Sequence, residues 1–141
     1  METGIKVGDC MRTSLITINE EASVFDAAKL LTAKNVGSLL VKDKKGKIYA
    51  ILTDEDLVRR ALAKNKLHAQ VSSIASKPLI GLTPDKDLSE AARIMGSKKI
   101  KRLVVFKDKS SAEPVGIISE SDIIRISPSL YDLIAERERI S

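Results

Sequence analysis

The amino-acid sequence predicts a mixed α/β (α+β) fold in which two β-α-β-β-α units pack through their sheets with pseudo-twofold symmetry. Two observations lead to this prediction. An internal repeat covers most of the 141 residues, and within each copy the spacing of apolar residues alternates between that of strands and that of helices. A unit of about sixty residues buries only about 60% of the surface of its unfolded chain, so we expect each copy to cover an exposed sheet face of the other.

The repeat emerges when Val7 is aligned with Val71, an offset of 64 residues that also places Ala27-Ala28 on Ala91-Ala92. The later copy gains two residues within positions 109–113, which we interpret as a turn, and beyond it the offset is 66. Similar residues at one offset, interrupted once in a loop, indicate duplication.

The repeat divides the chain into three parts. We expect a first domain over residues 1–66, a second domain over residues 67–127, and a linker between them at residues 64–68. Residues 128–141 form a C-terminal tail, where Pro128 is typical of the start of a short helix and residues 136–139 are expected to face water.

Each copy is predicted to fold as strand, helix, strand, strand and helix. Residues 24–31 carry apolar side chains at i, i+3, i+4 and i+7, as on an amphipathic helix, and Ser23 is a suitable N-cap. The apolar runs at residues 38–41 and 48–52 predict two strands, and a second helix is expected to begin near Thr53.

Composition favours a folded domain in the cytoplasm. Hydrophobic residues account for 43% of the chain and charged residues for 30%, the balance of a soluble globular protein. No apolar run approaches the roughly 20 residues of a membrane-spanning helix, so we expect no membrane partner. The single cysteine, Cys10, has no disulfide partner and fits a reducing compartment. The net charge of +5 favours anionic partners without choosing among them.

The sequence contains no recognisable catalytic or metal-binding motif. The only histidine, His68, lies in the expected linker, and a general base would need a positioned partner. No Cys and His residues have the spacing of a zinc site, and none of the seven glycines belongs to a nucleotide-phosphate loop. We therefore expect no enzyme activity and no required cofactor or metal.

One motif recurs where the last strand of each copy meets the following helix, as Thr53-Asp54-Glu55-Asp56 and as Ser119-Glu120-Ser121-Asp122. Each fits the S/T-x-x-D pattern of a capping box. A helix start is also an anion site, and an aspartate there can accept hydrogen bonds from both ribose hydroxyls, each contributing roughly 1.5–3 kcal/mol. The motif is therefore compatible with helix capping and with a site for an adenosine phosphate whose base lies between apolar residues such as Ile18 and Leu82.

Taken in order, these motifs resemble a tandem cystathionine β-synthase (CBS) domain pair, also called a Bateman module, of the stand-alone kind. The resemblance covers residues 5–127. It rests on Val7–Met11, Leu15–Ile18, Ala27-Ala28, Leu39–Val41 and Thr53-x-x-Asp56, and on Ile80–Thr83, Ala91-Ala92, Lys101–Val105 and Gly116–Asp122 in the second copy.

The resemblance implies two clefts for an adenosine ligand, with AMP, ADP, ATP or S-adenosylmethionine as candidates. One cleft would use Asp122 for ribose, Ser119 and Ser121 with Arg102 for phosphate, and Ile16, Val36 and Ile117 around adenine. The mirror cleft would use Asp56 for ribose, Thr53 near phosphate, Ile80, Ile100 and Ile51 as its apolar wall, and Lys101 nearby. A homodimer is also implied.

The first copy departs from the family pattern at two positions. Ala50 replaces the usual glycine and adds a methyl group where the resemblance places the ligand. Glu55 stands where the second copy has Ser121 and brings a negative charge towards a phosphate. We therefore expect the Asp122 cleft to bind a phosphorylated ligand more tightly than the Asp56 cleft.

Three functions are compatible with the sequence. The first is a non-catalytic, energy-sensing regulatory module that rearranges on binding an adenosine nucleotide and so changes the activity of a separate, unidentified protein. The second is nucleic-acid binding through the basic surface, which the low aromatic content of 3% disfavours because few side chains can stack on bases. The third is a purely structural dimerisation module in which the aspartates only cap helices.

Overall fold

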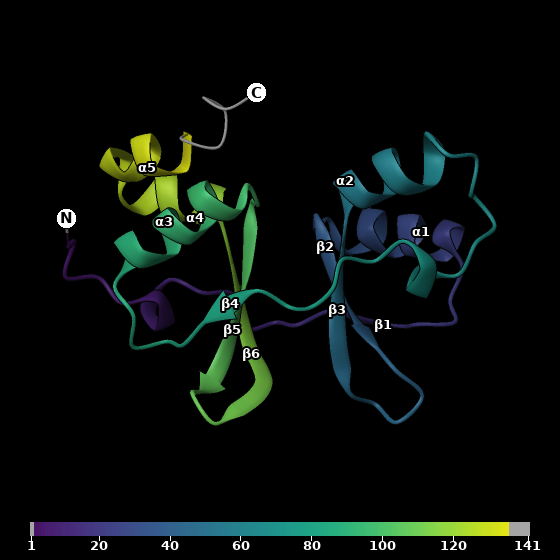
Figure 1. The fold of residues 1–141 in the computed structure, drawn as a ribbon, viewed down its shortest axis with the longest axis horizontal. Helices are drawn as coiled ribbons and strands as arrows, with labels where there is room; N and C mark the ends of the chain where they lie inside the picture. Colours follow the sequence, from purple (N-terminus) through teal and green to yellow (C-terminus); the bar gives the residue numbers. More distant parts are fainter. Residues whose placement is uncertain (1, 136–141) are drawn as a thin grey trace. The chain divides into compact units, whose positions relative to one another are not determined.

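The computed structural model describes residues 2–135 and contains two three-stranded sheets with the strand orders β1-β2-β3 and β4-β5-β6, each accompanied by helices (Figure 1). The predicted mixed α/β fold and the β-α-β-β-α order of each copy are confirmed. The elements of the first copy are the 3-10 turn η1 (Val7–Asp9), β1 (Thr17–Asn19), α1 (Val24–Lys34), β2 (Ser38–Lys42), β3 (Ile48–Thr53), α2 (Asp54–Asp56) and the π-helical segment η2 (Leu57–Leu62). Those that follow are η3 (Val71–Ser73), β4 (Gly81–Leu82), α3 (Leu88–Lys98), β5 (Arg102–Asp108), β6 (Ser111–Ser119), α4 (Glu120–Ile126), η4 (Pro128–Leu130) and α5 (Tyr131–Ala135).

The compact units of the structure are divided differently from the sequence repeats. Unit 2 consists of Leu15–Leu79, whereas unit 1 combines Met1–Ser14 with Ile80–Ser141. The opening segment of each repeat therefore belongs to the unit that holds the remainder of the other repeat. Residues 64–68, the expected linker, lie inside unit 2, where the Lys66 amide donates to the Ala61 carbonyl at 2.8 Å.

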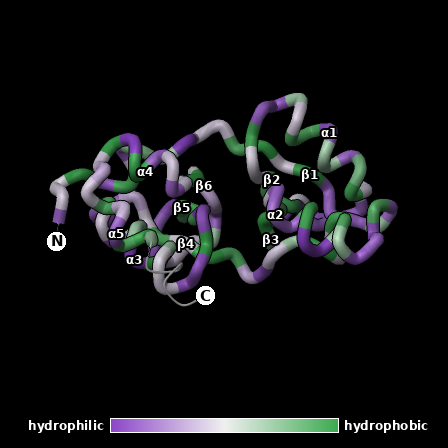
Figure 2. The backbone as a smooth tube through the Cα atoms, turned by 90° about the horizontal axis from the view of Figure 1, so that it is seen from above, coloured by the Kyte–Doolittle hydropathy of each residue, from purple (hydrophilic) through white to green (hydrophobic). Residues whose placement is uncertain are grey.

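Unit 2 is a sheet covered by apolar residues of its helices. Strand β1 pairs in parallel with β2, and β2 pairs antiparallel with β3. Hydrophobic and hydrophilic residues alternate along α1 (Figure 2), and its N-cap Ser23 accepts a hydrogen bond from the Asp26 amide as the sequence predicts. The core contains Ile18, Val24, Ala27, Leu31, Leu39, Val41, Ala50, Leu52, Ala61, Val71, Ile74 and Ala75.

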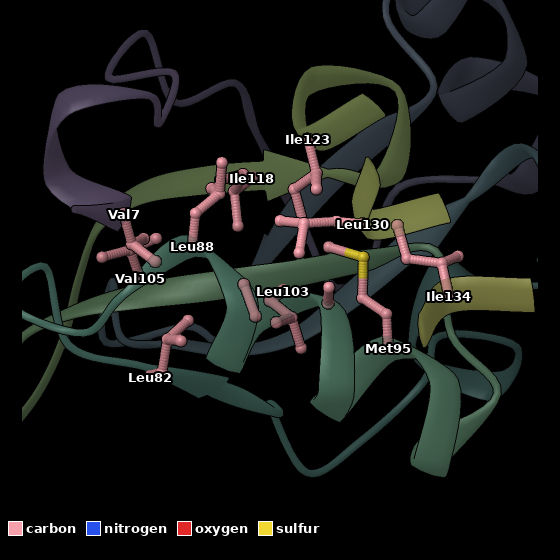
Figure 3. Close-up of a cluster of buried hydrophobic side chains, with 12 residues drawn as sticks. Val7, Leu82, Leu88, Met95, Leu103, Val105, Ile118, Ile123, Leu130 and Ile134 are labelled. Carbon is pink, nitrogen blue, oxygen red and sulfur yellow. The ribbon is translucent and has the colours of Figure 1, made fainter. Parts of the chain in front are cut away.

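Unit 1 repeats this arrangement with a longer hairpin. Strand β4 pairs in parallel with β5, and β5 pairs antiparallel with β6. The turn expected at 109–113 is shorter than predicted, because β6 already begins at Ser111 and register shifts in the ladder absorb the extra residues. Side chains from the strands, α3, α4 and the C-terminal helical segment point towards one another in the core (Figure 3).

The C-terminal tail makes the two units unequal. Pro128 starts η4, and α5 packs on α3 with Leu130 and Ile134 buried in the core of unit 1. Residues 136–139, expected to face water, lie outside the described residues. The face of α3 that carries Ser89, Ala92 and Gly96 is buried, whereas Phe25, which matches Ser89 in the first copy, is 61% exposed on α1.

Candidate functional site

Both copies of the recurring motif form complete capping boxes, as the S/T-x-x-D pattern predicts. The Thr53 hydroxyl accepts from the Asp56 amide at 3.1 Å, and the Thr53 amide donates to Oδ2 of Asp56 at 3.0 Å. The Ser119 hydroxyl and amide make the corresponding bonds with Asp122, at 3.2 and 3.0 Å. Capping thus occupies one carboxylate oxygen of each aspartate and directs the other oxygen to different partners.

The Asp122 carboxylate is buried, with only 1% of its side chain exposed, and is surrounded by cations. Its Oδ1 accepts from Nε and Nη2 of Arg12 at 3.2 and 3.1 Å, and from Nη2 of Arg125 at 2.8 Å. Burial by itself would raise the pKa of Asp122, but the hydrogen bonds from Arg12, Ser119 and Arg125 outweigh burial and hold that pKa below its ordinary value.

Hydroxyl and basic groups gather next to Asp122. The hydroxyls of Ser119 and Ser121 lie 2.9 Å apart, and Ser121 is exposed. Arg102 stands directly opposite Ser119 in the ladder between β5 and β6, and the Glu120 amide donates to the Lys101 carbonyl at 2.9 Å. The fold therefore brings Ser119, Ser121 and Arg102, predicted to contact phosphate, to the same strand ends as Asp122.

The Asp56 carboxylate, in a residue that is 8% exposed, has different partners. The Ser76 hydroxyl lies 3.1 and 3.3 Å from its two oxygens, and Nε of Arg60 lies 3.6 Å from Oδ1. Ser76 is placed by a two-way backbone bridge to Ile51, with N–O distances of 2.8 and 3.0 Å. Asp56 therefore has a hydroxyl where Asp122 has the guanidinium of Arg12.

The predicted apolar residues are divided between the units. Ile117 lies on β6 two positions before Ser119, and Ile51 lies two positions before Thr53 on β3; both are half-buried. Ile80 and Ile100 belong to unit 1, whereas Ile16 and Val36 belong to unit 2. The predicted combination of Ile16 and Val36 with Asp122, and of Ile80, Ile100 and Lys101 with Asp56, stays a prediction.

The sequence motifs did not predict the contacts of Arg12 and Ser76 with the two aspartates, because neither residue belongs to the recurring motif. The only available signal was their matching position, 64 residues apart, immediately after the opening segment of each repeat. Arg12 exchanges two backbone hydrogen bonds with Ile117, at 2.8 and 2.9 Å, just as Ser76 does with Ile51.

The difference between Ala50 and Gly116 has a packing explanation in the structure, and the ligand explanation expected from the sequence stays a prediction. A Cβ atom at Gly116 would lie 2.6 Å from Sδ and 2.9 Å from Cγ of Met11. Alignment of the repeats matches Met11 with Ala75, which is buried in the same core as Ala50. Gly116 thus leaves space for the large side chain of Met11 in unit 1, whereas Ala50 in unit 2 is matched with the small side chain of Ala75.

Metal ligation, membrane spanning and thiol reactivity were the other chemical properties to consider in the described part of the chain. Within residues 2–135 no three His, Cys, Asp or Glu side chains are grouped to hold a metal ion. Over the same range no helix has the length and apolar character needed to cross a membrane. Burial, followed by the charges of Asp9 and Asp122, raises the pKa of the Cys10 thiol, which disfavours its reactive thiolate.

The sequence pattern of the CBS domain matches residues 7–63 and 71–129. The chain belongs to the CBS domain family. The resemblance inferred from the motifs is thereby confirmed, and each match contains one of the two capping boxes and the aspartate within it.

The chain is similar in sequence to a curated relative and in fold to solved structures. Uncharacterized protein MJ0653 of Methanocaldococcus jannaschii is 34% identical over 138 residues, which cover 97% of this chain and 70% of that protein. The CBS domain pair of protein MJ0100, solved with 5'-methylthioadenosine and S-adenosyl-L-methionine, is 29% identical with a TM-score of 0.79 and covers 92% of this chain and 98% of that one. CBSX2, solved in complex with AMP, is 26% identical with a TM-score of 0.72, covering 91% and 99%.

Proposed function

We propose that this CBS domain pair is a non-catalytic regulatory module that binds an adenosine nucleotide and thereby changes the activity of a separate partner protein in the cytoplasm. The observation that carries the proposal is the group around Asp122, where a buried carboxylate, two serine hydroxyls and arginines meet at the end of β6. These groups offer an acceptor for ribose hydroxyls and donors for phosphate. That MJ0100 and CBSX2 were solved with adenosine compounds supports this choice of ligand class.

In this proposal Asp122 accepts hydrogen bonds from the ribose, and Ser119, Ser121 and Arg102 bind the phosphate. The adenine ring contacts half-buried Ile117 on β6. Among the candidate ligands we place AMP, ADP and ATP first, because the basic groups favour a phosphorylated ligand; S-adenosylmethionine is the alternative. Energy sensing follows if the occupancy of the site tracks the balance of these nucleotides.

We propose that the second group, at Asp56, binds phosphorylated ligands more weakly. Asp56 would take the ribose, with Thr53 near the phosphate and Ile51 as a further contact. The helix start is acidic, because Asp54, Glu55 and Asp56 follow one another. A carboxylate about 4 Å from a phosphate charge costs about 1 kcal/mol in water and about 4 kcal/mol at an effective dielectric of 20.

Calorimetric titration of the intact chain with AMP, ADP, ATP and S-adenosylmethionine tests the function. We expect at least one adenosine nucleotide to bind and, at 100 times its dissociation constant, to stabilise the fold by about 2.7 kcal/mol. Asp122→Ala should weaken binding more than Asp56→Ala. Asp26→Ala is the matched control, since Asp26 also occupies the third position of a helix but is 59% exposed on its side chain.

The ranking of the two groups is tested without touching a buried aspartate. Ser121→Glu places the residue of the first copy in the second, and Glu55→Ser makes the reverse exchange. We expect Ser121→Glu to weaken AMP binding and Glu55→Ser to strengthen any weak second binding event. A larger loss from Asp56→Ala than from Asp122→Ala contradicts the ranking. A chain that binds none of the four ligands contradicts the function and leaves the nucleic-acid-binding and purely structural alternatives.

We also propose a homodimer in which a second copy covers the exposed helices of unit 2. Phe25 on α1 and Val58 and Leu62 on η2 are 57–61% exposed, and α1 and η2 are in contact. A hollow of about 350 Å³ lies on α1 beside Ala28, and α5 covers the matching face in unit 1. The ion pairs Lys29–Asp26 and Arg59–Glu55 give this face charges of both signs, so it can oppose a copy of itself.

Sedimentation equilibrium tests this interface. We expect the wild-type chain to be dimeric and Phe25→Ser with Leu62→Ser to shift it to monomer. A control substitution of the exposed Tyr131 on unit 1 should leave the dimer intact. A monomeric wild-type chain, or a dimer unaffected by the double change, excludes this face.

A further inference from the structure

The pairing of Arg12 with Asp122 limits how a ligand can reach that aspartate. Oδ1 of Asp122 already accepts three N–H groups, two from Arg12 and one from Arg125, and Oδ2 accepts the Ser119 amide. Each carboxylate oxygen has about two acceptor positions, so Oδ1 is saturated and Oδ2 has one position left. The two hydroxyls of a ribose can therefore both bond to Asp122 only where one of the donors on Oδ1 leaves.

Arg12 is the donor best able to leave. Arg125 lies three residues after Asp122 on α4, so its short bond is maintained by the helix. The Ser119 amide is fixed by the capping box. The side chains of Arg12 and Arg125 are similarly exposed, at 60% and 64%, but Arg12 reaches Asp122 from a segment 110 residues away in the chain, so no helix holds its guanidinium in place. Its backbone stays in place because of the two hydrogen bonds with Ile117.

We propose that Arg12 determines the specificity of the Asp122 site for phosphorylated adenosine ligands. Ribose hydroxyls take the place of its guanidinium on Asp122, and the released guanidinium pairs with the phosphate of the same ligand. A nucleoside without phosphate displaces the arginine but offers it no anion in return, so it binds less tightly. This inference rests on the proposed function, because it assumes that Asp122 binds ribose.

The other copy provides an internal comparison. Ser76 occupies the position of Arg12, makes the same backbone bridge to its neighbouring strand, and places a neutral hydroxyl on Asp56. Nε of Arg60 lies 3.6 Å from that carboxylate, and Arg60 follows Asp56 by four residues in the same helical segment. A ribose that displaces Ser76 releases no charge that a phosphate could neutralise. The Asp56 group therefore lacks this source of preference for a phosphorylated ligand.

The test compares AMP with adenosine by calorimetric titration of the wild-type chain, Arg12→Ser and Arg12→Lys. We expect the wild-type chain to prefer AMP, and Arg12→Ser to weaken AMP binding by roughly 10- to 100-fold, the range for loss of one charge-assisted hydrogen bond. Adenosine binding should be unchanged or tighter, because the competitor for Asp122 is gone. Arg12→Lys, which keeps the charge, should retain part of the preference even if Arg12→Ser is poorly folded.

Arg93→Ser is the control, because Arg93 is an exposed arginine in the middle of α3, and it should leave the ratio of the two affinities unchanged. Equal weakening of AMP and adenosine in Arg12→Ser, or no weakening of AMP, overturns the role of Arg12 while leaving the proposed function standing. A wild-type chain that binds neither ligand overturns the proposed function and this inference together.

Discussion

The contact between Gly116 and Met11 predicts a specific coupling between two substitutions. In Gly116→Ala the new methyl group would lie 2.6 Å from Sδ and 2.9 Å from Cγ of Met11, and 3.1 Å from the Arg12 carbonyl oxygen. Such overpacking typically costs about 1–3 kcal/mol. We expect the lower end, about 1 kcal/mol, because the unbranched side chain of methionine can rotate away while the backbone carbonyl needs to shift little.

Met11→Ala removes the obstructing side chain and leaves a gap. Met11 is half-buried, so we expect a loss of about 1–2 kcal/mol, less than the ~2–5 kcal/mol of a fully buried methionine. In the double variant the new methyl group of residue 116 fills part of that gap and recreates the Ala50 and Ala75 pair of the other unit. The two costs should therefore not add, and we expect a coupling of about 1 kcal/mol in favour of the double variant.

Urea unfolding of the four proteins, wild type, two single variants and the double variant, measures this coupling from the change in midpoint at constant slope. Additive costs, or a double variant less stable than the sum of the single losses, refute the packing explanation of the glycine. Additivity would return Gly116 to the role first expected for it, as a position kept free for a ligand.

Three further predictions concern stability. The pKa of Asp122 is lower in the folded chain than in the unfolded chain, so its contribution to stability is present above about pH 4 and is lost as the pH falls through the folded pKa. The unfolding free energy, measured as the pH is lowered, should therefore fall less steeply for Asp122→Asn than for wild type. Leu130→Ala should cost about 2–5 kcal/mol in thermal or urea unfolding because Leu130 is fully buried, whereas Tyr131→Ala, 44% exposed, should change stability by less than about 0.5 kcal/mol. Asp87 is the N-cap of α3 and also accepts hydrogen bonds from the amides of Thr3 and Gly4. Asp87→Ala should therefore lower the unfolding free energy by about 1 kcal/mol and speed hydrogen exchange at both amides. Unchanged exchange at these amides would contradict the anchoring of the N-terminal segment.

The asymmetry of the two aspartates has one consequence for regulation. Both are buried at the same position of the same motif, yet one is held by arginine and the other by serine. A duplicated scaffold can thus present two groups that differ in charge while keeping the backbone geometry of both. Ligands that differ only in phosphate content would then distinguish the two halves of the chain.

Local patterns of the sequence were sufficient to predict the order of strands and helices and both capping boxes. Capping depends on residues three positions apart, and amphipathic helices on a spacing of 3.6 residues, so neighbours in sequence carry this information. The predicted boundaries were wrong where a short polar segment is compatible with both a turn and a strand. The turn at 109–113 is one example, because polar residues there continue as strand β6.

The amino-acid sequence by itself determined that this chain is a duplicated β-α-β-β-α protein of the CBS family with an aspartate at the third position of each capped helix. Only the tertiary structure decided what those aspartates contact. The opening segment of each repeat joins the unit formed by the other repeat, which brings Arg12 to Asp122 across 110 residues and Ser76 to Asp56. No local periodicity encodes such pairings, because they depend on the long-range packing of Val7 and Val71 into separate cores.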